Sequence, residues 1–130
     1  MDIIELAGYG NIKNLIESAQ EGNADAQYNL GVRYFEGKEV QQSYIEAAKW
    51  YSSAADQGDK QAQFNLGLMF YHGTGMPKNY LYAYELFSLA AAQGDDRAKQ
   101  GMAAILTEAP ADQVAEIRKL DGKDTDATRH

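Results

Sequence analysis

The sequence predicts an all-α protein, an α/α superhelix (solenoid) of stacked helix-turn-helix repeats. Two observations predict this class. Residues 26–37 (AQYNLGVRYFEG) return as residues 62–73 (AQFNLGLMFYHG), and fourteen positions are identical when residues 26–61 are laid over residues 62–97. A fixed period of this length is typical of repeat architectures. Within each period the apolar residues recur at the spacing of one helix face, so each repeat is expected to contain helices rather than strands.

Three short junctions divide the chain, and each pairs a glycine with Asn or Asp: Gly22-Asn23, Gly58-Asp59 and Gly94-Asp95. Glycine can take the left-handed conformation that ends a helix, and the next side chain can cap the helix that follows. Residues 1–120 are predicted to form one repeat domain, with an ambiguous helical turn at residues 1–7. Its units are a half repeat at 11–22, full repeats at 23–58 and 59–94, and a degenerate third repeat with a C-terminal capping helix at 95–120.

The first helix of each full repeat is predicted at residues 24–36 and 60–72. Ala26, Leu30 and Tyr34 form one apolar stripe, which the second copy repeats with Ala62, Leu66 and Phe70. Gly31 and Gly67 stand in the middle of these helices, where glycine costs roughly 1 kcal/mol relative to alanine. Close approach of the following helix is expected to offset this cost, with Ala47 or Ala83 as the partner.

The second helices are predicted at residues 43–57 and 79–93. Ser43 and Glu46 form a capping box, and Asn79 takes the capping position in the next copy. Their inward faces alternate large and small residues: Ala47, Trp50, Tyr51, Ala54 and Ala55, then Ala83, Leu86, Phe87, Ala90 and Ala91. Tyr80, Tyr82 and Tyr84 cannot all share one helix face, so at least one of them is expected to be exposed.

The ends of the chain are predicted from weaker patterns. Asn11 suits the cap of a helix over residues 12–21. Residues 95–106 indicate another helix, which residues 107–110 should break, with Pro110 in the first turn of a last helix at 110–120. That last helix carries Val114, Ile117 and Leu120 on one side and should cover the open end of the stack. Residues 121–130 have no apolar pattern and are predicted to be a disordered tail.

Charge and composition exclude several classes of function. The net charge is −7, and the longest run of basic residues is Arg118–Lys119, whereas nucleic acids and anionic membranes both attract basic surfaces. The chain has no cysteine and no apolar stretch long enough to span a membrane. The localisation is not fixed by the sequence. The acidic start, MDIIELAGYG, slightly favours the cytoplasm, and a periplasmic or secreted location stays open if a signal peptide was removed.

The pattern A-Q-x-N-L-G-x-x-[YF]-x-x-G, followed by A-x-x-W-Y-x-x-A-A-x-x-G-D, resembles the Sel-one-like repeat family, which is related to the tetratricopeptide repeats. The resemblance covers about residues 12–106. It implies a right-handed α/α superhelix that acts as an adaptor in protein–protein contacts, with the first helices lining a concave face. Glu39 stands where the second copy has Gly75 and the family usually has glycine, which raises the question whether both loops take the same shape.

The side chains expected on the concave face are the candidate partner-binding residues: Asn29, Arg33, Glu36, Asn65, Met69 and His72. Each has a structural alternative. Asn29 and Asn65 can serve hydrogen bonding between adjacent repeats, and Met69, like Ile105 in the third unit, can be covered by the C-terminal helix. These alternatives leave a partner groove of mixed polarity with an apolar floor as the functional interpretation.

No catalytic, metal or cofactor site is predicted. His72 and His130 are the only histidines, and the pair Asp95–Asp96 is explained by helix capping. The sequence therefore predicts a non-enzymatic adaptor that binds a protein or peptide partner, as a monomer or with weak self-association. An inhibitor or immunity-type protein that blocks one enzyme is the alternative. A hydrolase is the third hypothesis, and the absence of a catalytic set in the sequence speaks against it.

Overall fold

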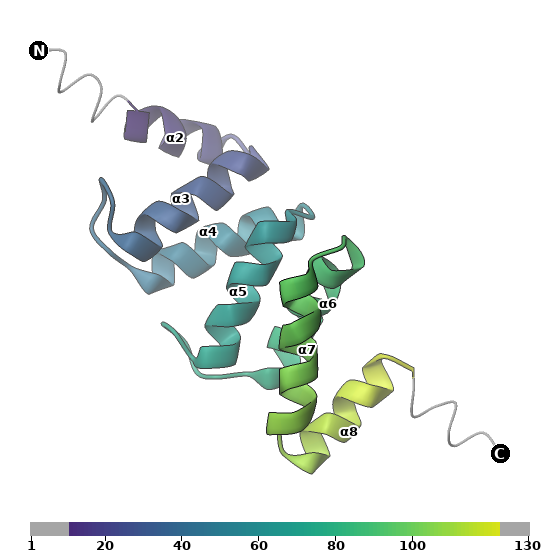
Figure 1. Cartoon of the computed structure of the whole chain (residues 1–130). Helices are drawn as coiled ribbons and strands as arrows, with labels where there is room; N and C mark the ends of the chain where they lie inside the picture. The colour runs from purple at the N-terminus through teal and green to yellow at the C-terminus, as the bar shows by residue number, and fades with distance from the viewer. Residues whose placement is uncertain (1–10, 123–130) are drawn as a thin grey trace, which may run out of the picture.

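The computed structural model describes residues 11–122, and every regular element in that part of the chain is an α-helix (Figure 1). The helices, in chain order, are α2 (Asn11–Gln20), α3 (Ala24–Glu36), α4 (Tyr44–Asp56), α5 (Lys60–His72), α6 (Tyr80–Ala92), α7 (Asp96–Glu108) and α8 (Ala111–Leu120). The predicted all-α solenoid is confirmed. The turn expected at residues 1–7, and residues 123–130 of the expected tail, lie outside the described residues.

The tight junctions between units form as the sequence indicates. Gly22, Gly58 and Gly94 have φ of +98°, +94° and +94°, so each leaves its helix in the left-handed region. The side chains of Asn23 and Asp59 then accept hydrogen bonds at 2.9 Å from the backbone N–H of Ala26 and Ala62. One helix therefore ends and the next begins within three residues, which makes consecutive helices antiparallel neighbours.

The two long loops, residues 37–43 and 73–79, take the same backbone shape. Gly75 has φ +79°, and a Cβ there would lie 2.6 Å from the Cβ of Tyr44, so only glycine fits. Glu39, at the equivalent position, adopts φ +68° although it is not glycine. Its carboxylate forms an ion pair with Arg33 of α3, which helps to hold this uncommon conformation.

The glycines in the middle of the first helices accommodate aromatic rings rather than alanines. A Cβ at Gly31 would lie 2.6 Å from the Tyr51 ring, and one at Gly67 would lie 2.7 Å from the Phe87 ring. The prediction that Ala47 packs against Gly31 was therefore wrong. At Gly67, Ala83 contributes only its carbonyl oxygen, which would lie 3.5 Å from an added Cβ. Both rings are almost fully buried, so the missing Cβ leaves room for a large core side chain.

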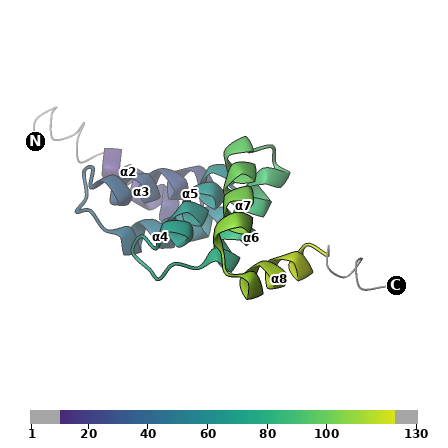
Figure 2. The same ribbon diagram turned by 60° about the horizontal axis from the view of Figure 1, so that its bottom comes forward.

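The core is a seam between two layers of helices. Figure 2 shows α3, α5 and α7 in one layer and α4 and α6 in the other. Leu30 and Leu66, on the predicted stripes, are 1% and 3% exposed, and Ala47, Ala54, Ala83 and Ala90 of the facing helices are fully buried. Of the three tyrosines at the start of α6, Tyr84 is buried and Tyr82 is exposed, as the helical spacing required.

The C-terminal end differs from the prediction in three details. α7 continues through Thr107 to Glu108, and the Thr107 hydroxyl donates a hydrogen bond to the Ala104 carbonyl within the helix. Pro110 precedes α8 as its cap residue instead of lying in its first turn. Leu120 is 59% exposed, so the packing face of α8 does not include it.

α8 nevertheless closes part of the stack. It packs against α6, with Ile117 fully buried between them. The Tyr84 hydroxyl of α6 donates a hydrogen bond of 2.5 Å to Asp121 Oδ2 directly after α8. Burial, reinforced by this bond, raises the pKa of Tyr84 to about 12. The end of α8 is thus tied to the second full repeat.

Candidate functional site: a groove between the first helices

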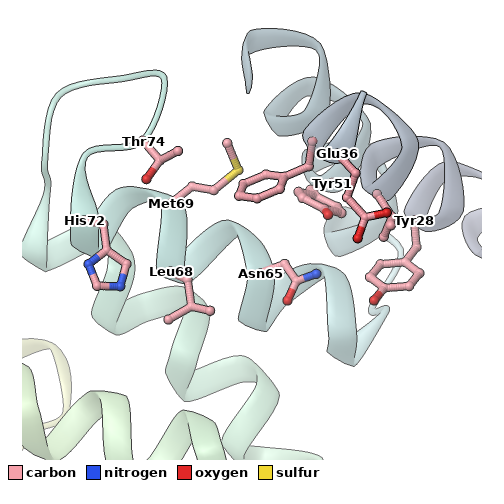
Figure 3. A pocket seen from close by; sticks show the side chains of 10 residues that line it. Tyr28, Glu36, Tyr51, Asn65, Leu68, Met69, His72 and Thr74 are labelled. Atoms are coloured by element: carbon pink, nitrogen blue, oxygen red, sulfur yellow. The ribbon is translucent and has the colours of Figure 1, made fainter. Parts of the chain in front are cut away.

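A groove of about 340 Å³ lies between the first helices of the two full repeats. Most of its lining comes from α3 and α5, with one ring from α4 and one loop residue: Tyr28, Val32, Phe35, Glu36, Tyr51, Asn65, Leu68, Met69, His72 and Thr74. Figure 3 shows Tyr28, Tyr51 and Glu36 on one side and Asn65, Leu68, Met69 and His72 on the other. The walls are thus built by two repeats stacked in register.

The structure brings together four of the six predicted contact residues. Glu36, Asn65, Met69 and His72 all line the groove. Asn29 is exposed on α3 but is not part of the lining. Arg33 also lies outside the lining, and its guanidinium is paired with Glu39.

Met69 forms the floor of the groove. Its side chain is 2% exposed and packs in the cluster that contains Tyr51, Leu66 and Leu86. The C-terminal helix does not cover it, so that alternative is wrong for Met69. It is right for Ile105, which is fully buried in the same cluster as Ile117 of α8.

Asn65 holds the junction between the two repeats. Burial raises the pKa of Tyr51 to about 12, and a side-chain hydrogen bond from Asn65 opposes part of that shift. The equivalent pair one repeat later is Phe87 and Gly101, in which neither the hydroxyl nor the amide is present. A buried hydroxyl needs a partner and a bare ring does not, so the amide of Asn65 matches Tyr51, while at Gly101 a Cβ would lie only 2.6 Å from the Phe87 ring. This agrees with the expectation that Asn65 bonds between adjacent repeats.

The apolar lining was not selected from the sequence. Tyr28 packs on Tyr51 with ring centroids 5.8 Å apart, and Val32 and Leu68 are half-buried in the walls. The sequence did contain a signal for them. Tyr28 and Phe64 occupy equivalent positions of the two repeats and are both apolar, and the same holds for Val32 and Leu68. Residues that stay apolar at one phase but do not belong to the core stripe point to a second apolar surface.

The carboxylate pair Asp95–Asp96 serves the fold. Asp95 accepts hydrogen bonds from the backbone N–H of Arg97 and Ala98, which confirms capping. The Arg97 guanidinium beside it lowers the pKa of Asp95 and also lies 4.1 Å from the centre of the Phe64 ring. Among residues 11–122 no group of three or more His, Asp or Glu side chains is placed to hold a metal ion. None of the helices in this range is long and apolar enough to cross a membrane.

Comparison with known families identifies the repeat. The Sel1 repeat, the family called Sel-one-like above, matches residues 24–59 and residues 60–95. The chain belongs to the Sel1 repeat family. Sel1 repeat proteins are generally non-enzymatic scaffolds for protein interactions.

Solved Sel1-type structures share the fold. A Sel1 repeat protein from Oxalobacter formigenes superimposes with a TM-score of 0.70 and 34% identity, covering 72% of this chain and 39% of that one. A protective antigen of uropathogenic Escherichia coli, described as having an SLR fold, gives a TM-score of 0.73 and 32% identity, covering 91% of this chain and 26% of that one.

A curated relative is similar over a shorter stretch. The secretory immunoglobulin A-binding protein EsiB of Escherichia coli O6:H1 is 35% identical over 54 residues, which is 40% of this chain and 11% of EsiB. This Sel1 repeat chain therefore spans about a tenth of that relative and between a quarter and two fifths of the two solved chains.

Proposed function

We propose that this Sel1 repeat chain is an adaptor that binds a segment of a partner protein in the groove between α3 and α5. The observation that carries the proposal is the lining of the groove. Three aromatic rings and three aliphatic or thioether side chains meet there, beside the carboxylate of Glu36, the amide of Asn65 and the imidazole of His72. Apolar walls with a few convergent polar groups are typical of sites that recognise a ligand.

The groove is already formed without a ligand. Its floor, Met69 and Tyr51, is buried in the core, and its walls are helices joined by capped junctions. A partner therefore orders few side chains of this protein when it binds, which reduces the entropic cost of association. Of the predicted contacts, Glu36, Asn65, Met69 and His72 belong to the proposed site. Asn29 and Arg33 would contact only a partner that extends past the groove along α3.

The partner itself is not carried over from a relative. Immunoglobulin binding is named for EsiB, and the matched stretch is too small a part of that protein to transfer it. The proposal concerns a peptide segment of a protein, held by apolar contacts with the walls and by polar contacts with the three groups named above.

A peptide library tests the proposal. Random 12-residue peptides displayed on phage are selected on the immobilised protein, and the enriched peptides are measured by fluorescence polarisation. Leu68→Ser removes a wall of the groove, and Leu89→Ser is the matched control, because Leu89 is 53% exposed on α6. Burial of a leucine side chain is worth about 1.5–3 kcal/mol, so the first variant should weaken binding roughly ten-fold or more. The control should bind as the wild type does. Equal losses in both variants, or no enriched peptide, would contradict a binding groove at this place.

A further inference from the structure

One aromatic pair occurs in both full repeats at the end of the first helix and the start of the second. In the first repeat it is Phe35 and Tyr44, with ring centroids 5.0 Å apart. In the second repeat it is Tyr71 and Tyr80, at the same phase and 5.9 Å apart. The two loops that separate the rings have the same shape, so the pairs can be compared directly.

In the second repeat a lysine of the chain occupies the pair. The Lys78 ammonium lies 4.9 Å from the centre of the Tyr80 ring and 5.9 Å from that of Tyr71. It also donates a hydrogen bond of 3.2 Å to the Tyr80 hydroxyl. The Tyr71 hydroxyl in turn donates to the Glu108 carboxylate at 2.5 Å. The two rings and the nearby carboxylate form a setting that suits a cation.

In the first repeat the same pair has no resident cation. Gln42 takes the place of Lys78, and its amide donates to the Phe35 carbonyl at 3.4 Å. Phe35 and Tyr44 are 37% and 41% exposed. Among the residues that the structure describes, no Lys or Arg side chain lies over either ring.

The open pair adjoins the α3–α5 groove. Phe35 belongs to the lining of the groove, and so does its neighbour Glu36, whose exposed carboxylate is the only Asp or Glu in that lining. No Lys or Arg lines the groove, and the net charge of the chain is −7. The charge of the groove lining therefore complements a basic ligand.

We propose that the Phe35–Tyr44 pair receives a Lys or Arg side chain of the partner, as Tyr71 and Tyr80 receive Lys78 within the chain. The partner segment is then basic next to apolar: its cation lies on the two rings beside Glu36, and its apolar side chain lies between Val32 and Leu68. This inference rests on the proposed function, since it names the chemistry of the ligand of the same groove.

The second repeat supplies a sharp test, because Gln42→Lys should place an ammonium of the chain on the open pair. Positions 42 and 78 are equivalent in the two loops: a Cβ added at Gly37 would lie 2.8 Å from the Cβ of Gln42, and one added at Gly73 would lie 3.4 Å from the Cβ of Lys78. Gln41→Lys is the matched control, with the same change in charge at an exposed neighbouring residue. The probes are the peptides enriched from the phage library on the wild-type protein, each also synthesised with its Lys or Arg replaced by Gln.

The enriched peptides should carry a Lys or Arg beside an apolar residue. An exposed cation–π contact is worth about 0.5–1 kcal/mol, which corresponds to a two- to five-fold change in affinity. Gln42→Lys should therefore weaken the basic peptides by at least this factor more than Gln41→Lys does, and should leave the Gln-substituted peptides unaffected. Enriched peptides without basic residues, or equal effects of the two variants, would overturn the cation site and leave the groove standing. If no peptide is enriched, the groove and the cation site both fail.

Discussion

The side-chain amide of Gln57 at the end of α4 donates a 2.8 Å hydrogen bond to Oε1 of Gln27 in α3, and a second bond of 2.9 Å to the carbonyl of Gly22. Gln27 in turn donates to the carbonyl of Ala19 at 3.1 Å. The next repeat has the same arrangement, in which Gln93 donates to Gln63 and Gly58, and Gln63 to Ala55. These bonds give a second donor to the carbonyls of Ala19 and Ala55, which also accept from the backbone N–H of Gly22 and Gly58, and they link the junction glycines to the next helix pair.

Replacing the buried member of such a pair should destabilise the stack. Gln63 is 3% exposed, and Gln63→Leu leaves the Ala55 carbonyl and the Gln93 amide each without one partner. We expect a loss of about 1–3 kcal/mol in the free energy of unfolding, measured by urea denaturation. Gln61→Leu, on the exposed side of the same helix, is the control. If the free energies of unfolding of the two variants differ by less than roughly 0.5 kcal/mol, the glutamine pair has no role in stability.

Gly67→Ala tests the close packing against Phe87. Alanine is the better helix former by about 1 kcal/mol, but its Cβ would lie 2.7 Å from a ring that is fully buried. Overpacking of this kind typically costs about 1–3 kcal/mol, so the thermal midpoint should fall. Adding Phe87→Leu to Gly67→Ala should relieve part of this clash and so restore part of the lost thermal midpoint. A midpoint that rises with Gly67→Ala alone would show that the helix propensity decides at this site.

Glu39 allows the cost of its backbone conformation to be separated from its ion pair. Glu39→Gly and Glu39→Ala both remove the ion pair with Arg33, but only glycine accepts φ +68° without strain. The glycine variant should therefore be more stable than the alanine variant by about 1 kcal/mol. Chemical denaturation of the two variants measures this difference, and equal stabilities would mean that the loop relaxes.

Ionisation of Tyr51 should lower the free energy of unfolding at alkaline pH. Its pKa is raised by burial from 10.0 to about 12 in the folded protein, so the folded state favours the neutral phenol. This contribution to stability is complete below pH 10 and is lost as the pH rises from 10 to 12. Tyr51→Phe should cost about 0.5–1.5 kcal/mol at neutral pH through the lost bond to Asn65. The difference in the free energy of unfolding between the wild type and Tyr51→Phe should then shrink as the pH rises above 10, because only the wild type loses stability when Tyr51 ionises. Urea denaturation of both proteins at pH 7, 10 and 11 measures it, and a deficit that stays constant would contradict the assignment.

Much of the fold was predictable because its signals are local. The junction glycines, the caps Asn23, Ser43, Asp59 and Asn79, and the stripes through Leu30 and Leu66 fixed the type and approximate bounds of the helices. The partner of Gly31 was not predictable, since both Ala47 and Tyr51 lie on the inward face of the next helix and only the packing chooses between them. Leu120 was misassigned because α8 docks on α6 through Ile117, and its own periodicity does not reveal where that contact ends.

The candidate site was predicted less completely. Glu36, Asn65, Met69 and His72 followed from the assumption that first helices share one face. The repeated apolar positions of Tyr28 and Leu68 were visible in the sequence, but their role as groove walls, like that of Phe35, required the relative placement of α3 and α5. The cation site also needed the structure, because Lys78 and Gln42 differ in sequence without showing which rings lie beside them.

The binding groove is tested most directly by mapping a bound peptide onto the ¹⁵N-labelled protein by NMR. With the tightest peptide from the library, the amide signals of Val32, Phe35 and Glu36 in α3 and of Asn65, Leu68 and His72 in α5 should shift most. The signal of Leu89, which is 53% exposed on α6, should stay in place. Shifts concentrated on α4, α6 or α8, with α3 and α5 unchanged, would contradict the account.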